Sequence, residues 1–181
     1  MSETPNEGIV RHCPRCGAEG LDWPSRKQIR CRACGFHFFL NVASAVVAIL
    51  RCEGKLLLSV RGIEPGKGML DLPGGFLEPG ESGEEAVRRE LMEELGLDVT
   101  GPRYLFSFPN RYFHGDVWYD VLDLFFLVDL SEVPQLTPMD DVSAVRWVEP
   151  AEIDFGRIAF DSIRSGLGRF VREFGHGGPS A

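Results

Sequence analysis

The stretch GFLEPGESGEEAVRRELMEELGL, residues 75–97, decides the fold of this chain. Ser82 followed three residues later by Glu85 is a capping box, which predicts a helix that begins near Gly83. Gly96 is typical of the residue that follows a helix C-terminus, so the helix is predicted to end one residue before it. Apolar side chains recur every four residues along this helix and predict a buried stripe. The stripe comprises Val87, Leu91 and Leu95.

Three glutamates of this helix, Glu90, Glu93 and Glu94, stand at positions i, i+3 and i+4 and therefore share one face. Like charges in this arrangement repel each other by roughly a few tenths of a kcal/mol per pair on an exposed helix, and by more where water is excluded. Mg²⁺ binds a few carboxylates together with water and phosphate oxygens, and it would remove this repulsion. From these residues alone two interpretations stay open, a solvated acidic face and a divalent-metal site.

The full spacing of residues 75–97 resembles the Nudix box, G-x5-E-x7-R-E-U-x-E-E-x-G-U, in which U is an aliphatic residue. Every fixed position of the box is matched. The resemblance implies an α/β/α sandwich with a mixed sheet. It also implies metal-dependent hydrolysis of a nucleoside diphosphate that is linked to another group. The fixed positions are filled by Gly75, Glu81, Arg89, Glu90, Leu91, Glu93, Glu94, Gly96 and Leu97.

The resemblance also implies roles for single residues of the box. Glu90 and Glu94 are predicted to bind Mg²⁺ or Mn²⁺, with the backbone carbonyl of Gly75 completing the set of ligands. Glu93 is predicted to be either a further metal ligand or the catalytic base. Arg89 is expected to hold a glutamate in place, so Glu93, Glu90 and Arg89 form the predicted catalytic set.

Further acidic residues are candidates for the same site. Glu81 is expected either to pair with Arg89 or to bind a second metal ion through water. In many relatives an acid from a late loop joins the metals, which points to Asp141 or Asp140 here. For these two residues a solvated loop is an equal alternative.

Two CxxC pairs, separated by 14 residues, lie in the first part of the chain. Four thiolates at this spacing suit the tetrahedral preference of Zn²⁺ and resemble a zinc ribbon. So short a segment has too little apolar core to fold alone, and metal binding would supply the missing free energy. A four-cysteine site has no open position, so this zinc is predicted to be structural. The predicted ligands are Cys13, Cys16, Cys31 and Cys34.

The predicted domain boundaries follow from these motifs. Residues 1–8 are a mobile tail, 9–40 a zinc ribbon, 41–175 a Nudix domain and 176–181 a second mobile tail. Strands are expected at 42–50, 55–61, 69–75, 103–108, 117–130 and 144–150, a loop at 109–116, and a last helix from about Ala159.

Charge is unevenly distributed along the chain. Six basic and two acidic side chains give residues 9–40 a net charge of +4, whereas the whole chain carries −8, so the remainder carries −12. The acidic total argues against bulk nucleic-acid binding. A basic ribbon could nevertheless contact a phosphate-bearing partner, although packing of the ribbon on the main domain or a second subunit is the favoured interpretation.

Composition is that of a soluble globular protein, with no apolar run near 18 residues and no secretory signal, so no membrane partner and a cytoplasmic location are expected. Disulfides are then not expected, and Cys52 is interpreted as an inert buried thiol. A homodimer is common among relatives.

The sequence predicts the substrate contacts less specifically than it predicts the metal ligands. Arg61 and Lys67 are candidates for phosphate contacts, with plain surface charge as the alternative. Phe108 and Tyr112 are candidates for stacking on a nucleobase, with a place in the core as the alternative.

The ribbon followed by the box resembles the NADH pyrophosphatase branch, but of that branch's downstream SQPWPFPxS motif only Ser107-Phe108-Pro109 remains. The leading hypothesis is a pyrophosphatase acting on NAD(H) or ADP-ribose. A nucleoside triphosphate pyrophosphohydrolase is the second, and a non-catalytic nucleotide sensor or nucleic-acid-binding regulator is the third. Because no box glutamate is missing, the third is ranked lowest.

Overall fold

The structure is a computed structural model that describes residue 6 and residues 8–175. Most of the two predicted tails, 1–8 and 176–181, lies outside these residues. The chain divides into two compact units, each described by itself below. The first unit comprises residues 1–43 with 111–121, and the second comprises 44–110 with 122–181.

The first unit contains a small antiparallel sheet in the order β1-β2-β3. Its strands are β1 (Leu21–Ser25), β2 (Gln28–Cys31) and β3 (His37–Phe39). Its apolar interior is very small, because Ile29 is the one fully buried aliphatic side chain among the described residues of the ribbon. The two buried thiols of Cys13 and Cys31 complete that interior.

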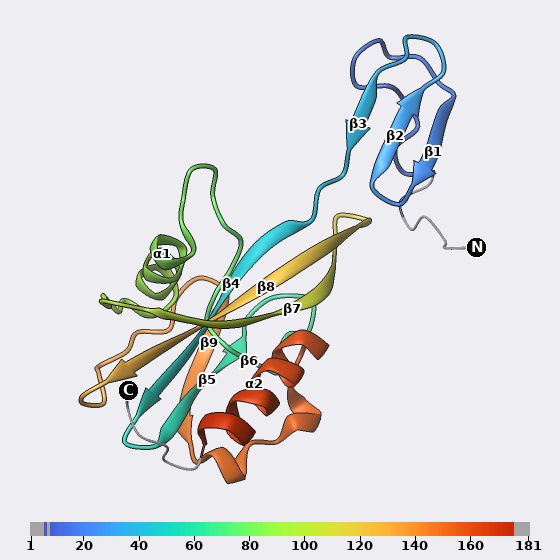
Figure 1. The fold of residues 1–181 in the computed structure, drawn as a ribbon. Coiled ribbons are helices and arrows are strands. Elements are labelled where there is room, and N and C mark those ends of the chain that lie inside the picture. The colour runs from blue at the N-terminus through green and yellow to red at the C-terminus, as the bar shows by residue number, and fades with distance from the viewer. Residues whose placement is uncertain (1–5, 7, 176–181) are drawn as a thin grey trace. The chain divides into compact units, whose positions relative to one another are not determined.

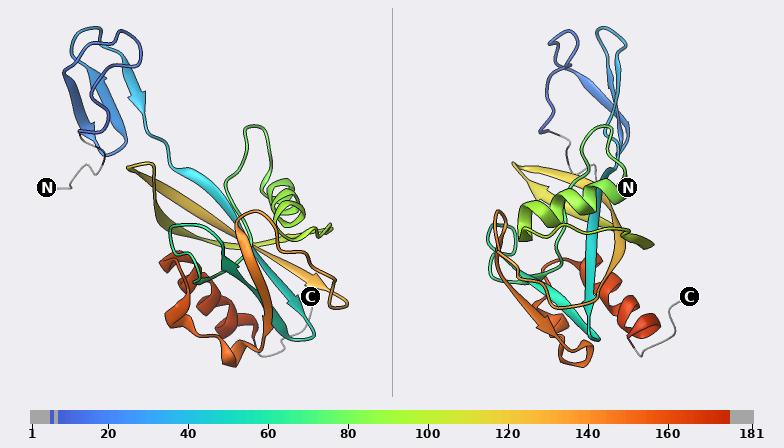
Figure 2. Two further views of the ribbon diagram at one scale, coloured as in Figure 1. Left: turned by 180° about the vertical axis from the view of Figure 1, so that it is seen from behind. Right: turned by 90° about the vertical axis from the view of Figure 1, so that its left-hand side faces the viewer.

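The second unit is organised on a six-stranded sheet with the path β6-β5-β4-β8-β7, to which β9 is added by pairing with β5. The β5 strand pairs antiparallel with β4, β6 and β9, whereas the neighbouring strands β4 and β8 run in the same direction (Figures 1 and 2), so the sheet is mixed. The strands are β4 (Ala43–Cys52), β5 (Lys55–Arg61), β6 (Leu70–Asp71), β7 (Arg103–His114), β8 (Val117–Leu130) and β9 (Val142–Val148).

Helices α1 (Gly83–Leu95) and α2 (Asp161–Phe174) lie on opposite faces of this sheet (Figures 1 and 2). Two short 3-10 helices, η1 (Pro150–Glu152) and η2 (Phe155–Arg157), precede α2. The predicted α/β/α sandwich with a mixed sheet is thus confirmed. None of the helices in the described part of the chain is long and apolar enough to cross a membrane.

Alternation of side chains along the central strands explains the two layers. In β4, Val47 and Ile49 pack in the cluster that contains α2, whereas Val46, Ala48 and Leu50 pack in the cluster that contains α1. Successive side chains of a strand point to opposite faces, so an apolar run buries both faces. The run that predicted a buried strand therefore also predicts a layer of structure on each side of it.

The ends of α1 are those predicted. The Ser82 hydroxyl accepts a hydrogen bond from the Glu85 amide at 3.3 Å, and the Glu85 carboxylate accepts one from the Ser82 amide at 2.8 Å. Gly96 closes the helix in the left-handed region at φ 65°, where glycine carries no steric penalty. The predicted stripe is buried, since its three apolar side chains are 0% exposed.

One expectation for the second half of the chain was wrong. The predicted loop at 109–116 is strand for most of its length, because β7 continues to His114. Pro109 is tolerated there because β7 is the edge strand of the path and can lack one amide donor. Gly115 and Asp116 have φ values of 56° and 64° and form a tight hairpin turn into β8.

Smaller differences concern element ends. The strand expected at 69–75 is reduced to Leu70–Asp71, β9 begins two residues earlier than expected, and α2 begins at Asp161. The residue before α2, Phe160, makes no side-chain cap, so the sequence carries no local signal for that start.

Two glycines of α2 have different roles, which a pair of alanine substitutions should separate. A Cβ at Gly166 would overlap the ring of Phe125 in β8, whereas a Cβ at Gly168 would make only ordinary contacts, 3.5 Å or more from its neighbours. We expect Gly166→Ala to lower the free energy of unfolding by about 1–3 kcal/mol through overpacking. Gly168→Ala should raise it by up to about 1 kcal/mol through helix propensity.

Urea denaturation followed by circular dichroism measures both changes. The Gly168 variant is the matched control for the backbone effect of the same substitution in the same helix. Equal and small effects of the two substitutions would contradict the close contact between α2 and the sheet.

Candidate active site and zinc site

Two glycines of the loop before α1 lie very close to neighbouring elements. A Cβ at Gly75 would overlap the carboxylate of Glu90 on α1, and a Cβ at Gly74, whose φ is 147°, would overlap the carbonyl of Val46 in β4. Glycine therefore lets this backbone pass between β4 and the Glu90 carboxylate. The Gly75 carbonyl accepts a hydrogen bond from the Val46 amide at 2.8 Å, and its second lone pair is free to bind another group.

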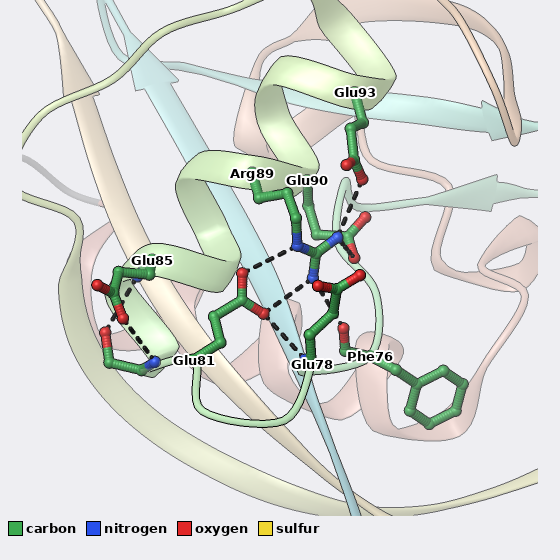
Figure 3. A network of polar contacts seen from close by, with 8 residues as sticks. Phe76, Glu78, Glu81, Glu85, Arg89, Glu90 and Glu93 are labelled. Atoms are coloured by element: carbon green, nitrogen blue, oxygen red, sulfur yellow. Dashed lines mark hydrogen bonds and ion pairs between the residues drawn. The ribbon is translucent and has the colours of Figure 1, made fainter.

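Arg89 is the centre of a charged network on α1 (Figure 3). Its guanidinium donates to both oxygens of Glu81 at 2.9 and 3.0 Å, to Glu90 at 2.8 Å and to Glu93 at 2.9 Å. It also donates to the Phe76 carbonyl at 2.9 Å. One cation thus contacts three of the box carboxylates, and its hydrogen bonds hold the pKa of Glu81 below the ordinary value. These contacts are the ones expected of a positioning residue.

The fourth glutamate, Glu94, is the most buried carboxylate of the box, at 6% exposure. Burial raises the pKa of its carboxyl to about 8. The Gly74 amide opposes this rise by donating to Glu94 at 3.0 Å, and the negative charges of Glu90, Asp71 and Asp141 add to it. The interior beside α1 therefore contains more carboxyl groups than cations to balance them.

This excess of carboxyl groups is the observation by which the fit of a divalent cation to the site can be judged. Burial also raises the pKa of Glu90, although the contact with Arg89 opposes the shift. Oxygen ligands with surplus negative charge suit Mg²⁺ or Mn²⁺. Among the described residues, the four cysteines are the one group of three or more His, Cys, Asp or Glu side chains whose ligand atoms all lie within 4.8 Å of one another. The box carboxylates are therefore not as closely gathered as the cysteines. The box carboxylates fit a hard cation in kind and charge, while Arg89 holds Glu90 and Glu93.

The late loop that was expected to supply an acid packs against the end of α1. The Met139 amide donates to the Glu94 carbonyl at 2.8 Å. Of the two candidates in this loop, Asp141 is the one whose charge acts on Glu94. Burial raises the pKa of Asp141, the Asp140 charge adds to the shift, and Arg61 opposes it. The structure thus distinguishes Asp141 from its exposed neighbour Asp140.

The candidate substrate contacts have different surroundings. Arg61 already donates to Asp71 at 2.7 Å and to the Pro65 carbonyl at 2.6 Å, and it lies 4.8 Å from the centroid of the Phe160 ring. Lys67 is exposed. Arg61 is therefore part of an internal network, whereas the Lys67 side chain lies on the surface.

The two aromatic candidates belong to different units. Phe108 packs against the α2-side core, edge-on to Phe125 with centroids 5.9 Å apart. Tyr112 stacks on His114 near the tip of the β7–β8 hairpin. Each ring therefore remains a separate candidate.

Sequence reasoning missed three buried polar residues. Asp71 is buried opposite Ser59 in the sheet and pairs with Arg61. Asp123 in β8 and Ser162 in α2 are each 3% exposed, and Asp123 Oδ2 and Ser162 Oγ lack a hydrogen-bond partner among the described residues. The one available signal was an acid flanked on both sides by apolar residues within a strand, which occurs at Asp71 and at Asp123.

The four predicted zinc ligands converge in the first unit. Their Sγ atoms all lie within 4.8 Å of one another, with Cys13 and Cys34 3.7 Å apart and Cys16 and Cys31 3.8 Å apart. Tetrahedral Zn–S bonds of about 2.3 Å place sulfurs roughly 3.8 Å apart, so the spacing fits Zn²⁺. The fifth cysteine, Cys52, is buried in the other unit and is not part of this cluster.

Both CxxC pairs are built in the same way. The Gly17 amide donates to the Cys13 carbonyl at 2.9 Å, and the Gly35 amide donates to the Cys31 carbonyl at 3.0 Å. Both glycines have positive φ, 73° and 68°, which the tight turn requires.

Comparisons with known proteins cover both units. A model of the NUDIX domain matches residues 40–174, and a model of the GTF2H2 zinc ribbon domain matches residues 10–42. An ADP-ribose pyrophosphatase from Methanocaldococcus jannaschii is 39% identical over 128 residues, which are 70% of this chain and 72% of that protein. The crystal structure of a NUDIX hydrolase from Nitrosomonas europaea is similar with a TM-score of 0.72 and 27% identity, covering 94% of this chain and 96% of that one.

A second group of relatives is longer. The NAD-capped RNA hydrolase NudC from Stutzerimonas stutzeri is 32% identical over 97 residues, 54% of this chain and 35% of that protein. The chain thus spans about a third of the length of this relative.

Proposed function

The chain belongs to the Nudix hydrolase family, and we propose that it is a divalent-metal-dependent pyrophosphatase that cleaves the diphosphate linkage of ADP-ribose. One observation carries the metal part of the proposal, namely the buried Glu94 carboxylate beside the charges of Glu90 and Asp141. Such a site favours a cation over a neutral ligand.

In this proposal the oxygen groups of the site divide into metal ligands and a proton acceptor. Glu90, Glu94 and the Gly75 carbonyl hold Mg²⁺ or Mn²⁺, with Asp141 beside them. A bound cation of this kind neutralises diphosphate oxygens and lowers the pKa of water. Glu93 is half exposed, with 50% of its side-chain surface accessible, and can accept a proton from water.

Arg89 positions this machinery. Its hydrogen bonds hold Glu90 and Glu93 at 2.8 and 2.9 Å, and Glu81 fixes the guanidinium itself from the other side. Phosphoryl transfer depends mainly on positioning and charge stabilisation, so a rigid carboxylate array is the property that this reaction requires.

The choice of ADP-ribose rests on the relatives. The pyrophosphatase named for ADP-ribose aligns over more than two thirds of both chains. The NudC relative is named for NAD-capped RNA, which supports an NAD-linked diphosphate as a second substrate class, but the match covers 35% of that protein, and the downstream motif of the NADH pyrophosphatase branch is not retained.

A substrate panel tests the proposal. ADP-ribose, NADH, NAD⁺ and a nucleoside triphosphate are incubated with the zinc-loaded protein and Mg²⁺ or Mn²⁺, and products are separated by chromatography. We expect AMP and ribose 5-phosphate from ADP-ribose at the highest kcat/KM, with Glu93→Gln slower by at least about 10²-fold.

Glu84→Gln, an exposed glutamate on the same helix, is the matched control and should keep wild-type turnover. Release of pyrophosphate from the triphosphate at a higher kcat/KM would contradict the substrate assignment. Equal turnover by Glu93→Gln and wild type would contradict the site itself.

A further inference from the structure

The outward face of the ribbon sheet carries aromatic and cationic side chains that the hydrolase site does not use. Strand register determines which residues share this face, because directly opposed residues point the same way. Arg30 lies opposite both Asp22 and His37, and Gln28 lies opposite Phe39. These five residues therefore share one face, and Ile29 and Phe38 share the other.

The cations on this face exceed the anions. Asp22 accepts from Arg32 at 2.6 Å and from Arg30 at 3.2 Å, so one carboxylate is shared by two guanidinium groups. Both arginines keep more than half of their side-chain surface exposed, 67% and 53%. One positive charge is therefore left over for an anionic ligand.

Aromatic rings lie next to these cations. Phe39 is 50% exposed, which is high for a phenylalanine in a strand, and His37 two residues earlier is also exposed. The Gln28 amide lies 2.9 Å from the His37 ring nitrogen and orients that ring.

We propose that this face, formed by Phe39, His37, Arg30 and Arg32, binds single-stranded nucleic acid. Bases stack on exposed aromatic rings and the backbone follows neighbouring cations in proteins that bind single strands. The net charge of +4 over residues 9–40, against −12 elsewhere, confines the attraction to this part of the chain. The total charge of −8 averages these two parts and conceals the basic one.

A phosphoprotein or a second copy of the chain would explain the cations but would not need flat exposed rings. A duplex would satisfy the cations but would hide its bases from Phe39. Discrimination between single strands and duplex is therefore the property that separates this proposal from simple electrostatic attraction.

The test uses the zinc-loaded full chain and fluorescence anisotropy. The probes are a labelled 12-nucleotide single-stranded RNA, the DNA of the same sequence, and the corresponding duplex, at 50–200 mM salt. We expect a single strand to bind at least about tenfold more tightly than the duplex. Preference for RNA or for DNA then identifies which strand is the natural ligand.

Variants locate the binding on this face. Phe39→Leu should lose about fivefold or more in affinity, whereas Phe39→Tyr should retain it because the ring can still stack. Arg30→Ala with Arg32→Ala should weaken binding and reduce the slope of log K against log salt by roughly 1.4. Asp22→Asn should bind more tightly, since both guanidinium groups lose their internal anion.

Arg172→Ala, an exposed arginine of α2, is the control and should bind like wild type. Zinc content and circular dichroism check that each variant is folded. Equal affinity for the duplex, unchanged affinity of Phe39→Leu, or no gain from Asp22→Asn would each overturn the proposal. Hydrolysis of ADP-ribose should be unchanged in all these variants, so the proposal stands or falls independently of the hydrolase assignment.

Discussion

Replacing Glu94 with glutamine is expected to lower kcat for diphosphate hydrolysis by at least about 10³-fold and, at the same time, to stabilise the metal-free protein. The loss of activity follows from removing a charged ligand from the metal site. The gain in stability follows from the burial of Glu94 beside other carboxylates. If the role of Glu94 were purely structural, its substitution would be expected to lower the melting temperature instead.

The pH dependence of the metal-free protein has a definite sign. The pKa of Glu94 is about 8 in the folded protein, compared with an ordinary value of 4.5. Between these pH values the folded state binds more protons than the unfolded state, so the stability contributed by this group falls as pH rises. We expect the melting temperature of the metal-free wild type to decrease from pH 5 to pH 8, and that of Glu94→Gln to decrease less.

Differential scanning calorimetry at pH 5, 6.5 and 8, with and without Mg²⁺, measures these effects. Mg²⁺ should raise the melting temperature of the wild type at pH 8 and have little effect on Glu94→Gln. Glu84→Gln controls for the loss of one charge on the same helix. A melting temperature of Glu94→Gln below that of wild type at pH 8, without metal, would contradict the argument.

Removing zinc is expected to unfold the ribbon and to release the tip of the β7–β8 hairpin, while α1 stays folded. Structural Zn²⁺ contributes roughly 10–16 kcal/mol of apparent binding free energy in small zinc domains. The ribbon has almost no apolar core to replace it. The hairpin tip, residues 111–121, belongs to the same compact unit.

Two contacts tie the hairpin tip to the N-terminal part of the same unit. The Arg26 guanidinium donates to both oxygens of Asp120 at 2.8 and 3.1 Å. The Asn6 side chain donates to the Trp118 carbonyl at 2.8 Å and accepts from the Trp118 amide at 3.0 Å, so it pairs with the strand as a backbone would. Arg26 lies between the two CxxC pairs, and the Asn6 carbonyl accepts a hydrogen bond from the Ile9 amide at 3.2 Å, so both residues are linked to the zinc-bound segment.

Hydrogen exchange read by mass spectrometry follows the three segments separately. After a strong zinc chelator, with Mg²⁺ restored, amides in 21–39 and 111–121 should lose protection, and amides in 83–95 should keep it. Cys31→Ser should reproduce this pattern without chelator, and Cys52→Ser should not, because Cys52 is outside the cluster. Unfolding of all three segments together, or an unchanged hairpin tip, would contradict the prediction.

The accuracy of the sequence predictions depended on how local each feature is. The helix ends were predictable because the capping box of Ser82 and Glu85 acts over three residues. The hairpin at 109–116 was missed because proline and glycine, here Pro109 and Gly115, are typical of turns when only the local sequence is considered. Their place in a strand depends on β8 and on the position of β7 at the edge of the path, which no local pattern contains.

The same distinction applies to the site. The sequence by itself determined the helix that carries the glutamates, the family to which the chain belongs and the four cysteines, because these depend on short, fixed spacings. Only the tertiary structure decided that Glu94 is buried beside Asp71 and Asp141, residues 23 and 47 positions away, and that the ribbon contacts the hairpin tip. Burial and charge coupling arise from segments that meet in space. The spacing of residues 75–97 therefore identified the glutamates of the site, but it could not show which of them is the most buried.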